Sequence, residues 1–162
     1  MPTFHKFDIA RTQLETAVDI FIRKLSYHSV ITLAGAASGI LAGLVREAGK
    51  ETFVDYARRV HEQMRGLTPK RESYAHHIEK FLGISAHKHL SDTDDDNIEL
   101  DVERLAANAL ARAIADYVTL RGQNEPFVQA YLQWAWITQD GPGMMSAYEE
   151  VPDKLRPMSN DK

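Results

Sequence analysis

Residues 28–47 carry the feature that most constrains the fold. The segment reads HSVITLAGAASGILAGLVRE and is apolar or small on nearly every side. As a helix it would have no solvent face, so we expect neighbouring helices to enclose it. Each glycine inside a helix costs about 1 kcal/mol relative to alanine, and close packing of other helices is the natural compensation. A membrane span needs roughly 20 apolar residues, and the apolar run from Val30 to Val45 is shorter than that. The segment therefore favours a buried central helix over a span.

Apolar periodicity predicts five further helices, over residues 8–27, 50–65, 68–82, 101–121 and 126–137. Ser26 or Ser29 is expected to cap the central helix, and Gly49 to end it. No stretch alternates with period two. We therefore expect an all-α fold, a single-domain bundle of about six helices over residues 1–138. Residues 139–162 are rich in glycine and proline, and we expect an irregular C-terminal tail there.

Composition restricts the class of protein. A chain of 162 residues is long enough for one domain with a substantial core. A net charge of -4 gives no general footprint for nucleic-acid binding. The absence of cysteine excludes disulfides, thiolate zinc sites and a cysteine nucleophile. The first residues, MPTFHKFDIAR, contain no apolar signal region, so we expect a cytoplasmic protein without a membrane segment.

Periodicity disappears between residues 83 and 100, where polar side chains concentrate. A loop of this length is often functional, and we take His87, Lys88, His89 and Asp92 as candidate binding residues. In an extended segment His87 and His89 would point to the same side. Two imidazoles with nearby carboxylates could bind a divalent transition metal. Alternatively, the histidines contact solvent and the aspartates stabilise the next helix N-terminus.

The same loop also fits part of a calcium-binding pattern. Asp92, Asp94, Asp96 and Glu103 stand at positions one, three, five and twelve of such a loop. Asn97 stands where the pattern has glycine, and acidic runs match this spacing easily by chance. His87, His89, Asp92, Asp94, Asp96 and Glu103 are therefore the candidate metal ligands.

A third pattern pairs Arg71 with His76, with four residues between them. This spacing resembles that of HEPN domains, small helical bundles in which arginine and histidine act on RNA, often across a dimer interface. Arginine would stabilise phosphorane-like charge, and histidine would transfer a proton. The alternative is a surface ion pair of Arg71 with Glu72 or Glu79. Arg71 and His76 are the candidate catalytic residues.

Several segments in order resemble a family of small all-helical bacterial proteins without an assigned activity. They are SVITLAGAA at 29–37, HKH at 87–89, IEL at 98–100 and the aromatic stretch at 127–134. Family members carry a SIHTLAxAA-like helix and an NFFKHADRDP-like loop. This chain has Ile31 in place of the motif histidine, Ser85 in place of asparagine and Ser91 in place of an acidic residue. If the family's site uses that histidine, His28 or His87 would have to substitute for it.

Together these patterns indicate a binding or regulatory module with a polar loop site and no assigned catalysis. A HEPN-like RNA-processing protein and a metal-binding protein are the alternatives. Gly35 and Gly39 are spaced to admit a second helix, although in water packing within the chain explains them better. We expect a homodimer, and a protein or RNA is the further partner considered.

Overall fold

The computed structural model describes residues 1–88 and 97–158 of the chain. In these residues it contains eight α-helices, one short 3-10 helix and no strand, which confirms the all-α prediction. The α-helices are α1 (Lys6–Ile22), α2 (Tyr27–Glu47), α3 (Phe53–Arg65), α4 (Arg71–Phe81), α5 (Ile84–Lys88), α6 (Val102–Arg121), α7 (Pro126–Thr138) and α8 (Gly141–Glu150). The 3-10 helix, η1, spans Asp153–Leu155.

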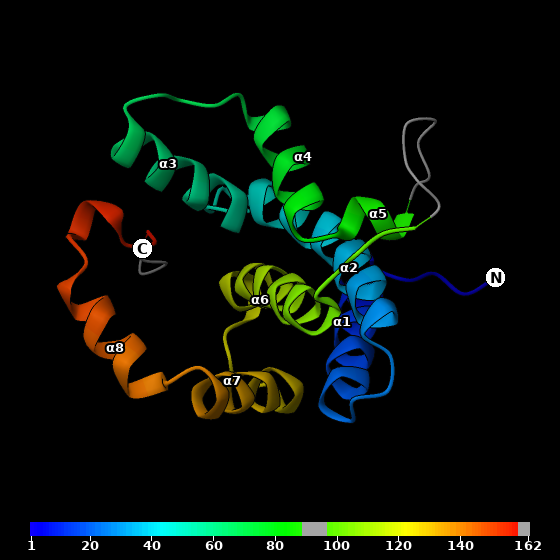
Figure 1. Ribbon diagram of the computed structural model, residues 1–162. Coiled ribbons are helices and arrows are strands. Elements are labelled where there is room, and N and C mark those ends of the chain that lie inside the picture. Colours follow the sequence, from blue (N-terminus) through cyan, green and yellow to red (C-terminus); the bar gives the residue numbers. More distant parts are fainter. Residues whose placement is uncertain (89–96, 159–162) are drawn as a thin grey trace.

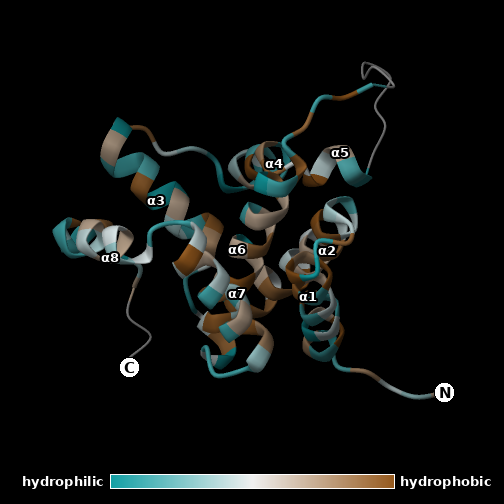
Figure 2. Ribbon diagram, turned by 60° about the horizontal axis from the view of Figure 1, so that its bottom comes forward, coloured by the Kyte–Doolittle hydropathy of each residue, from teal (hydrophilic) through white to brown (hydrophobic). Residues whose placement is uncertain are grey.

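Four helices supply most of the core. α2 packs against α1, α5 and α6, and α1 also packs against α7 (Figure 1). Brown, apolar segments gather where α1, α2, α6 and α7 meet, whereas much of α3 and α8 is teal or pale (Figure 2). The largest fully buried side chains include Tyr117, Leu14, Ile31, Leu41, Ile84 and Leu110.

The expectation that α2 lacks a solvent face is wrong. Nine of its 21 residues are buried, while Thr32 and Gly39 are exposed. Because glycine and alanine have small side chains, they expose little apolar area, and α2 need not be enclosed on every side. By length and hydropathy α2 is the one described helix that could also cross a membrane. The cores of soluble proteins contain helices that meet the same criterion, so this is weak support for a span.

Local signals set most helix ends. The Ser26 side chain accepts a hydrogen bond from the Ser29 backbone N–H and caps α2, and Gly49 follows with φ of 70°. Asp101 caps α6 in the same way through the Arg104 N–H. α4 begins at Arg71, three residues after the predicted start at residue 68, and the Thr68 hydroxyl donates to Glu62 rather than capping the helix.

Two helices lie where the sequence predicts irregular chain. α5 occupies residues 84–88 of the expected loop, and α8 occupies residues 141–150 of the expected tail. Asp140 has φ of 51° and accepts a hydrogen bond from the Gly143 N–H, which caps α8, and Pro142 is tolerated in the first turn. The tail is therefore largely ordered as helix through residue 150.

Candidate functional site

The N-terminus of α2 and the short helix α5 bring two histidines together. Because Ser26 caps α2, His28 lies in the first turn of that helix. Gly83 has φ of 72°, a conformation that glycine adopts without steric cost, and it separates α4 from α5. This turn directs α5 along α2 and places His87 near the end of α5.

The two imidazoles form a hydrogen-bonded pair, which we call the histidine pair. His28 Nδ1 lies 2.9 Å from His87 Nε2, and the ring centroids are 5.1 Å apart. The other nitrogen of His87, Nδ1, lies 2.7 Å from the Gly83 carbonyl oxygen. Since a carbonyl only accepts, Nδ1 of His87 carries the proton. In a neutral His87 ring, Nε2 then accepts the hydrogen bond that His28 Nδ1–H donates.

A close backbone approach fixes α5 on α2. Ile84 of α5 is fully buried, and a Cβ built on Gly35 would lie 2.7 Å from Ile84 Cγ2. Only glycine therefore leaves room for Ile84 at this depth. Gly39 and Gly43 have no atom within 4 Å of an added Cβ, so nothing in the described chain requires glycine there. Among the three glycines of α2, close packing in the described chain requires glycine only at position 35.

The residues next to the two histidines in the sequence, Lys88 and Tyr27, bring in charges of both signs. Lys88 follows His87 directly and is exposed. Glu103, in the first turn of α6, interacts with the phenol of Tyr27, the residue before His28. Burial raises the pKa of Tyr27, and the Glu103 carboxylate raises it further. Glu103 also lines a hollow of about 310 Å³ together with Asp101, Arg104, Trp134 and other residues.

Of the six predicted metal ligands, the structure describes only His87 and Glu103. His89, Asp92, Asp94 and Asp96 lie outside the described residues. His87 lies in a helix, so the extended segment that would align it with His89 does not extend through residue 87. Within residues 1–88 and 97–158, no three His, Cys, Asp or Glu side chains lie close enough to share a metal ion.

The two predicted RNA-cleaving residues lie apart on α4. Five residues along a helix correspond to a rotation of about 140°, so Arg71 and His76 leave the helix on different sides. Arg71 Nε donates to Asp55 Oδ1 of α3 at 2.8 Å, so its ion-pair partner is neither Glu72 nor Glu79. His76 is exposed.

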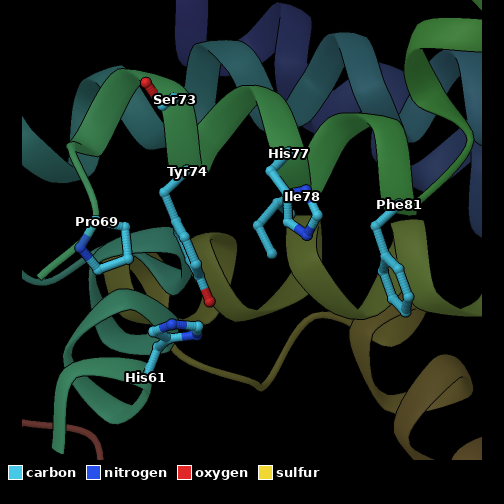
Figure 3. A pocket seen from close by; sticks show the side chains of 7 residues that line it. All are labelled: His61, Pro69, Ser73, Tyr74, His77, Ile78 and Phe81. Atoms are coloured by element: carbon cyan, nitrogen blue, oxygen red, sulfur yellow. The ribbon is translucent and has the colours of Figure 1, made fainter. Parts of the chain in front are cut away.

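A groove of about 420 Å³ lies between α3 and α4 (Figure 3). Its lining comprises His61, Pro69, Ser73, Tyr74, His77, Ile78 and Phe81. Figure 3 shows Tyr74 directed at His61, and their ring centroids are 5.8 Å apart. No Asp, Glu, Lys or Arg lines this groove in the described chain, and its polar groups are the two imidazoles, the Ser73 hydroxyl and the Tyr74 phenol.

A buried polar cluster was not anticipated from the sequence. Asp116 is fully buried, and its Oδ1 accepts a hydrogen bond from the Phe53 N–H at 2.8 Å, at the N-terminus of α3. Burial raises the pKa of Asp116 to about 6. Arg112 is also buried, with Nη1 3.9 Å from Glu79. The only sequence signal for this cluster is a pair of charged residues, Arg112 and Asp116, four positions apart in an alanine-rich helix. Amphipathic patterning alone places such charged residues on the solvent side of the helix.

Comparisons with known proteins leave the site to be interpreted from its geometry. No protein-family model, no curated protein and no solved structure matches the chain.

Proposed function

We propose that the chain is a helical binding or regulatory module whose site is the histidine pair. The observation that carries this proposal is the 2.9 Å hydrogen bond between His28 and His87, two residues 59 positions apart in the sequence. One ring is exposed and the other half-buried, so a ligand can reach both. The packing of Ile84 on Gly35 supports a rigid placement of the second ring, as binding sites require.

The site offers the ring nitrogens of two imidazoles, those of His28 and His87, to a ligand. A histidine nitrogen is a proton donor, a proton acceptor or a metal ligand, depending on its protonation. The Gly83 carbonyl keeps the proton on Nδ1 of His87 and so directs the basic Nε2 toward His28. The proposal assigns no catalysis to the pair. His89 and Asp92, which follow in the sequence, belong to the proposed site on sequence grounds alone.

The RNA-processing alternative rests only on the spacing of Arg71 and His76. An active site would need a second chain to bring together two side chains that leave α4 in different directions. No contact of His76 supports such a site in the described residues, and the ion pair with Asp55 occupies Arg71. We therefore prefer the histidine pair.

The proposal includes a cytoplasmic homodimer organised around α2. The open face of α2 at Gly39 and Gly43 favours the approach of a second helix, and the lack of cysteine suits a reducing compartment. Sedimentation across a hundredfold range of protein concentration tests the dimer. Gly39→Leu should shift the chain toward monomer, and an unchanged distribution that is monomeric throughout would contradict it.

A ligand panel tests the proposed site. Thermal unfolding of the full chain would be followed with inorganic phosphate, adenosine monophosphate and divalent metal ions in turn. A ligand that binds only the folded state raises the melting temperature. At least one class should stabilise the wild type and the control variant His76→Ala, but not His28→Ala. If every ligand acts equally on His28→Ala, the pair is not the binding site.

A further inference from the structure

We propose that the histidine pair binds a divalent transition-metal ion through His28 Nδ1 and His87 Nε2. This inference rests on the proposed function and names the ligand class of that site. Two imidazole nitrogens from different helices face each other there at 2.9 Å, and imidazole is a preferred ligand of zinc, copper and nickel.

The hydrogen bond of His87 to the backbone is the arrangement that metal-binding histidines use. A ligating imidazole usually donates its other ring N–H to a carboxylate or a carbonyl, which fixes the ring and leaves the ligating nitrogen basic. His87 Nδ1–H donates to the Gly83 carbonyl at 2.7 Å. His87 is therefore oriented and in the required tautomer before any ion arrives.

The distance between the two nitrogens is close to that between two ligands of one metal ion. With metal–nitrogen bonds of about 2.0–2.1 Å, two ligands at right angles lie about 2.9 Å apart, and tetrahedral ligands about 3.3 Å apart. The observed separation is 2.9 Å. Square-planar or octahedral Ni²⁺ or Cu²⁺ thus needs rotation of both rings, because the ion lies off the line that joins the two nitrogens, while tetrahedral Zn²⁺ needs an additional opening of about 0.4 Å.

Access and charge also bear on the site. His28 is exposed at the start of α2, so water can occupy the remaining coordination positions. Lys88 follows His87 in the sequence and its positive charge opposes a cation, whereas the negative charge of Glu103, which interacts with Tyr27, favours one. To bind the ion, His28 must lose the proton on Nδ1 that it donates to His87, and the neutral ring then carries its proton on Nε2 instead.

Another histidine lacks this arrangement. His5 uses Nδ1 to accept the Phe7 N–H and caps α1, so that nitrogen is already occupied. The exposed His76 of α4 provides a matched control, because its loss removes one imidazole from the surface without touching the pair.

The test is a titration of the full chain with Ni²⁺ and, separately, with Zn²⁺. Melting temperature is recorded for wild type, His28→Ala, His87→Gln and His76→Ala. At a tenfold excess over Kd, we expect a rise of roughly 3–6 °C for wild type and for His76→Ala. His28→Ala and His87→Gln should lose the rise or need at least tenfold more metal for it. Far-ultraviolet circular dichroism establishes that each variant is folded.

Two outcomes overturn the metal assignment. An equal rise in all four proteins would place the ion elsewhere in the chain, and no rise in the wild type would remove the ion altogether. If phosphate or adenosine monophosphate instead stabilises the wild type and not His28→Ala, the metal assignment fails while the proposed binding site stands.

Discussion

The core formed by α1, α2, α6 and α7 and the hairpin formed by α3 and α4 are stabilised in different ways. The core buries large apolar side chains such as Leu14, Leu41 and Tyr117. In α3 only Val54 is buried, and in α4 no residue is. Polar contacts tie the hairpin to itself and to α6, among them Asp116 with the Phe53 N–H and Arg71 with Asp55.

This difference in packing distinguishes the histidine pair from the α3–α4 groove. α5 follows the hairpin in sequence, yet its Ile84 is part of the apolar core and packs on Gly35 of α2. The histidine pair therefore adjoins the apolar core rather than the hairpin. The α3–α4 groove belongs to the part in which few apolar contacts oppose local opening.

Truncation of a core side chain should have the largest effect. Leu41→Ala removes a fully buried side chain and should lower the free energy of unfolding by about 2–5 kcal/mol. Met64→Ala in α3, where Met64 is 71% exposed, should change it by no more than about 0.5 kcal/mol. Urea denaturation measures both variants. Similar losses would show that the hairpin is packed as tightly as the core.

The polar attachment of the hairpin should depend on pH. The pKa of Asp116 is raised from 3.8 to about 6, chiefly by burial, despite the Phe53 N–H and the Arg112 charge that lower it. The folded state therefore binds more protons than the unfolded state between these values. The stability that protonated Asp116 provides is complete below pH about 4 and is lost as the pH rises through about 6.

Asp116→Asn isolates this contribution. The difference in unfolding free energy, wild type minus Asp116→Asn, should fall by at most about 3 kcal/mol between pH 4 and pH 7. Asparagine keeps an oxygen that can accept the Phe53 N–H, so the variant is a conservative reference. Urea unfolding at several pH values gives the difference. A flat difference, or one that rises with pH, would contradict the raised pKa.

Glycine substitutions in α2 sharpen the contrast between the packed and the open parts of that helix. Gly35→Ala forces Ile84 away and should cost about 1–3 kcal/mol, and it should weaken ligand binding at the histidine pair. Gly39→Ala meets open space in the monomer and should gain up to about 1 kcal/mol from helix propensity. The double variant Gly35→Ala, Ile84→Ala should recover part of the lost binding. Equal effects at both glycines would remove the positioning role of Gly35.

The smallest effect is expected at the edge of the hairpin. Arg71 is more than half exposed in its ion pair with Asp55, so Arg71→Ala should cost no more than about 1 kcal/mol. Since we assign Arg71 a structural contact and the chain no catalysis, neither the wild type nor the variant should cleave a structured RNA. Loss of an RNA-cleaving activity in both Arg71→Ala and His76→Ala would favour the HEPN-like alternative.

Sequence reasoning reached the fold class and most helix ends because these depend on local signals. The apolar stripes, Ser26 before α2 and Gly49 after it all act over a few residues. The helices α5 and α8 were missed because one has five residues and the other begins with Gly-Pro-Gly. Such helices depend on tertiary contacts or a single cap rather than on periodicity.

The site was only partly accessible for the same reason. His87 and Lys88 stood out by local density of polar residues, and His28 entered only as a substitute for a missing motif histidine. Their contact joins residues far apart in sequence and depends on the turn at Gly83 and the packing of Ile84 on Gly35. Asp116 was missed because its partner, the Phe53 N–H, belongs to another helix.

The most direct test of the central claim is a long-range ¹H–¹⁵N spectrum of the histidine side chains in the full chain near neutral pH. Our account predicts that His87 is protonated at Nδ1 and unprotonated at Nε2, and that Ni²⁺ or Zn²⁺ perturbs the signals of His28 and His87 before those of His76. A His87 ring protonated at Nε2 only, or one that interconverts freely between its tautomers, would contradict the account.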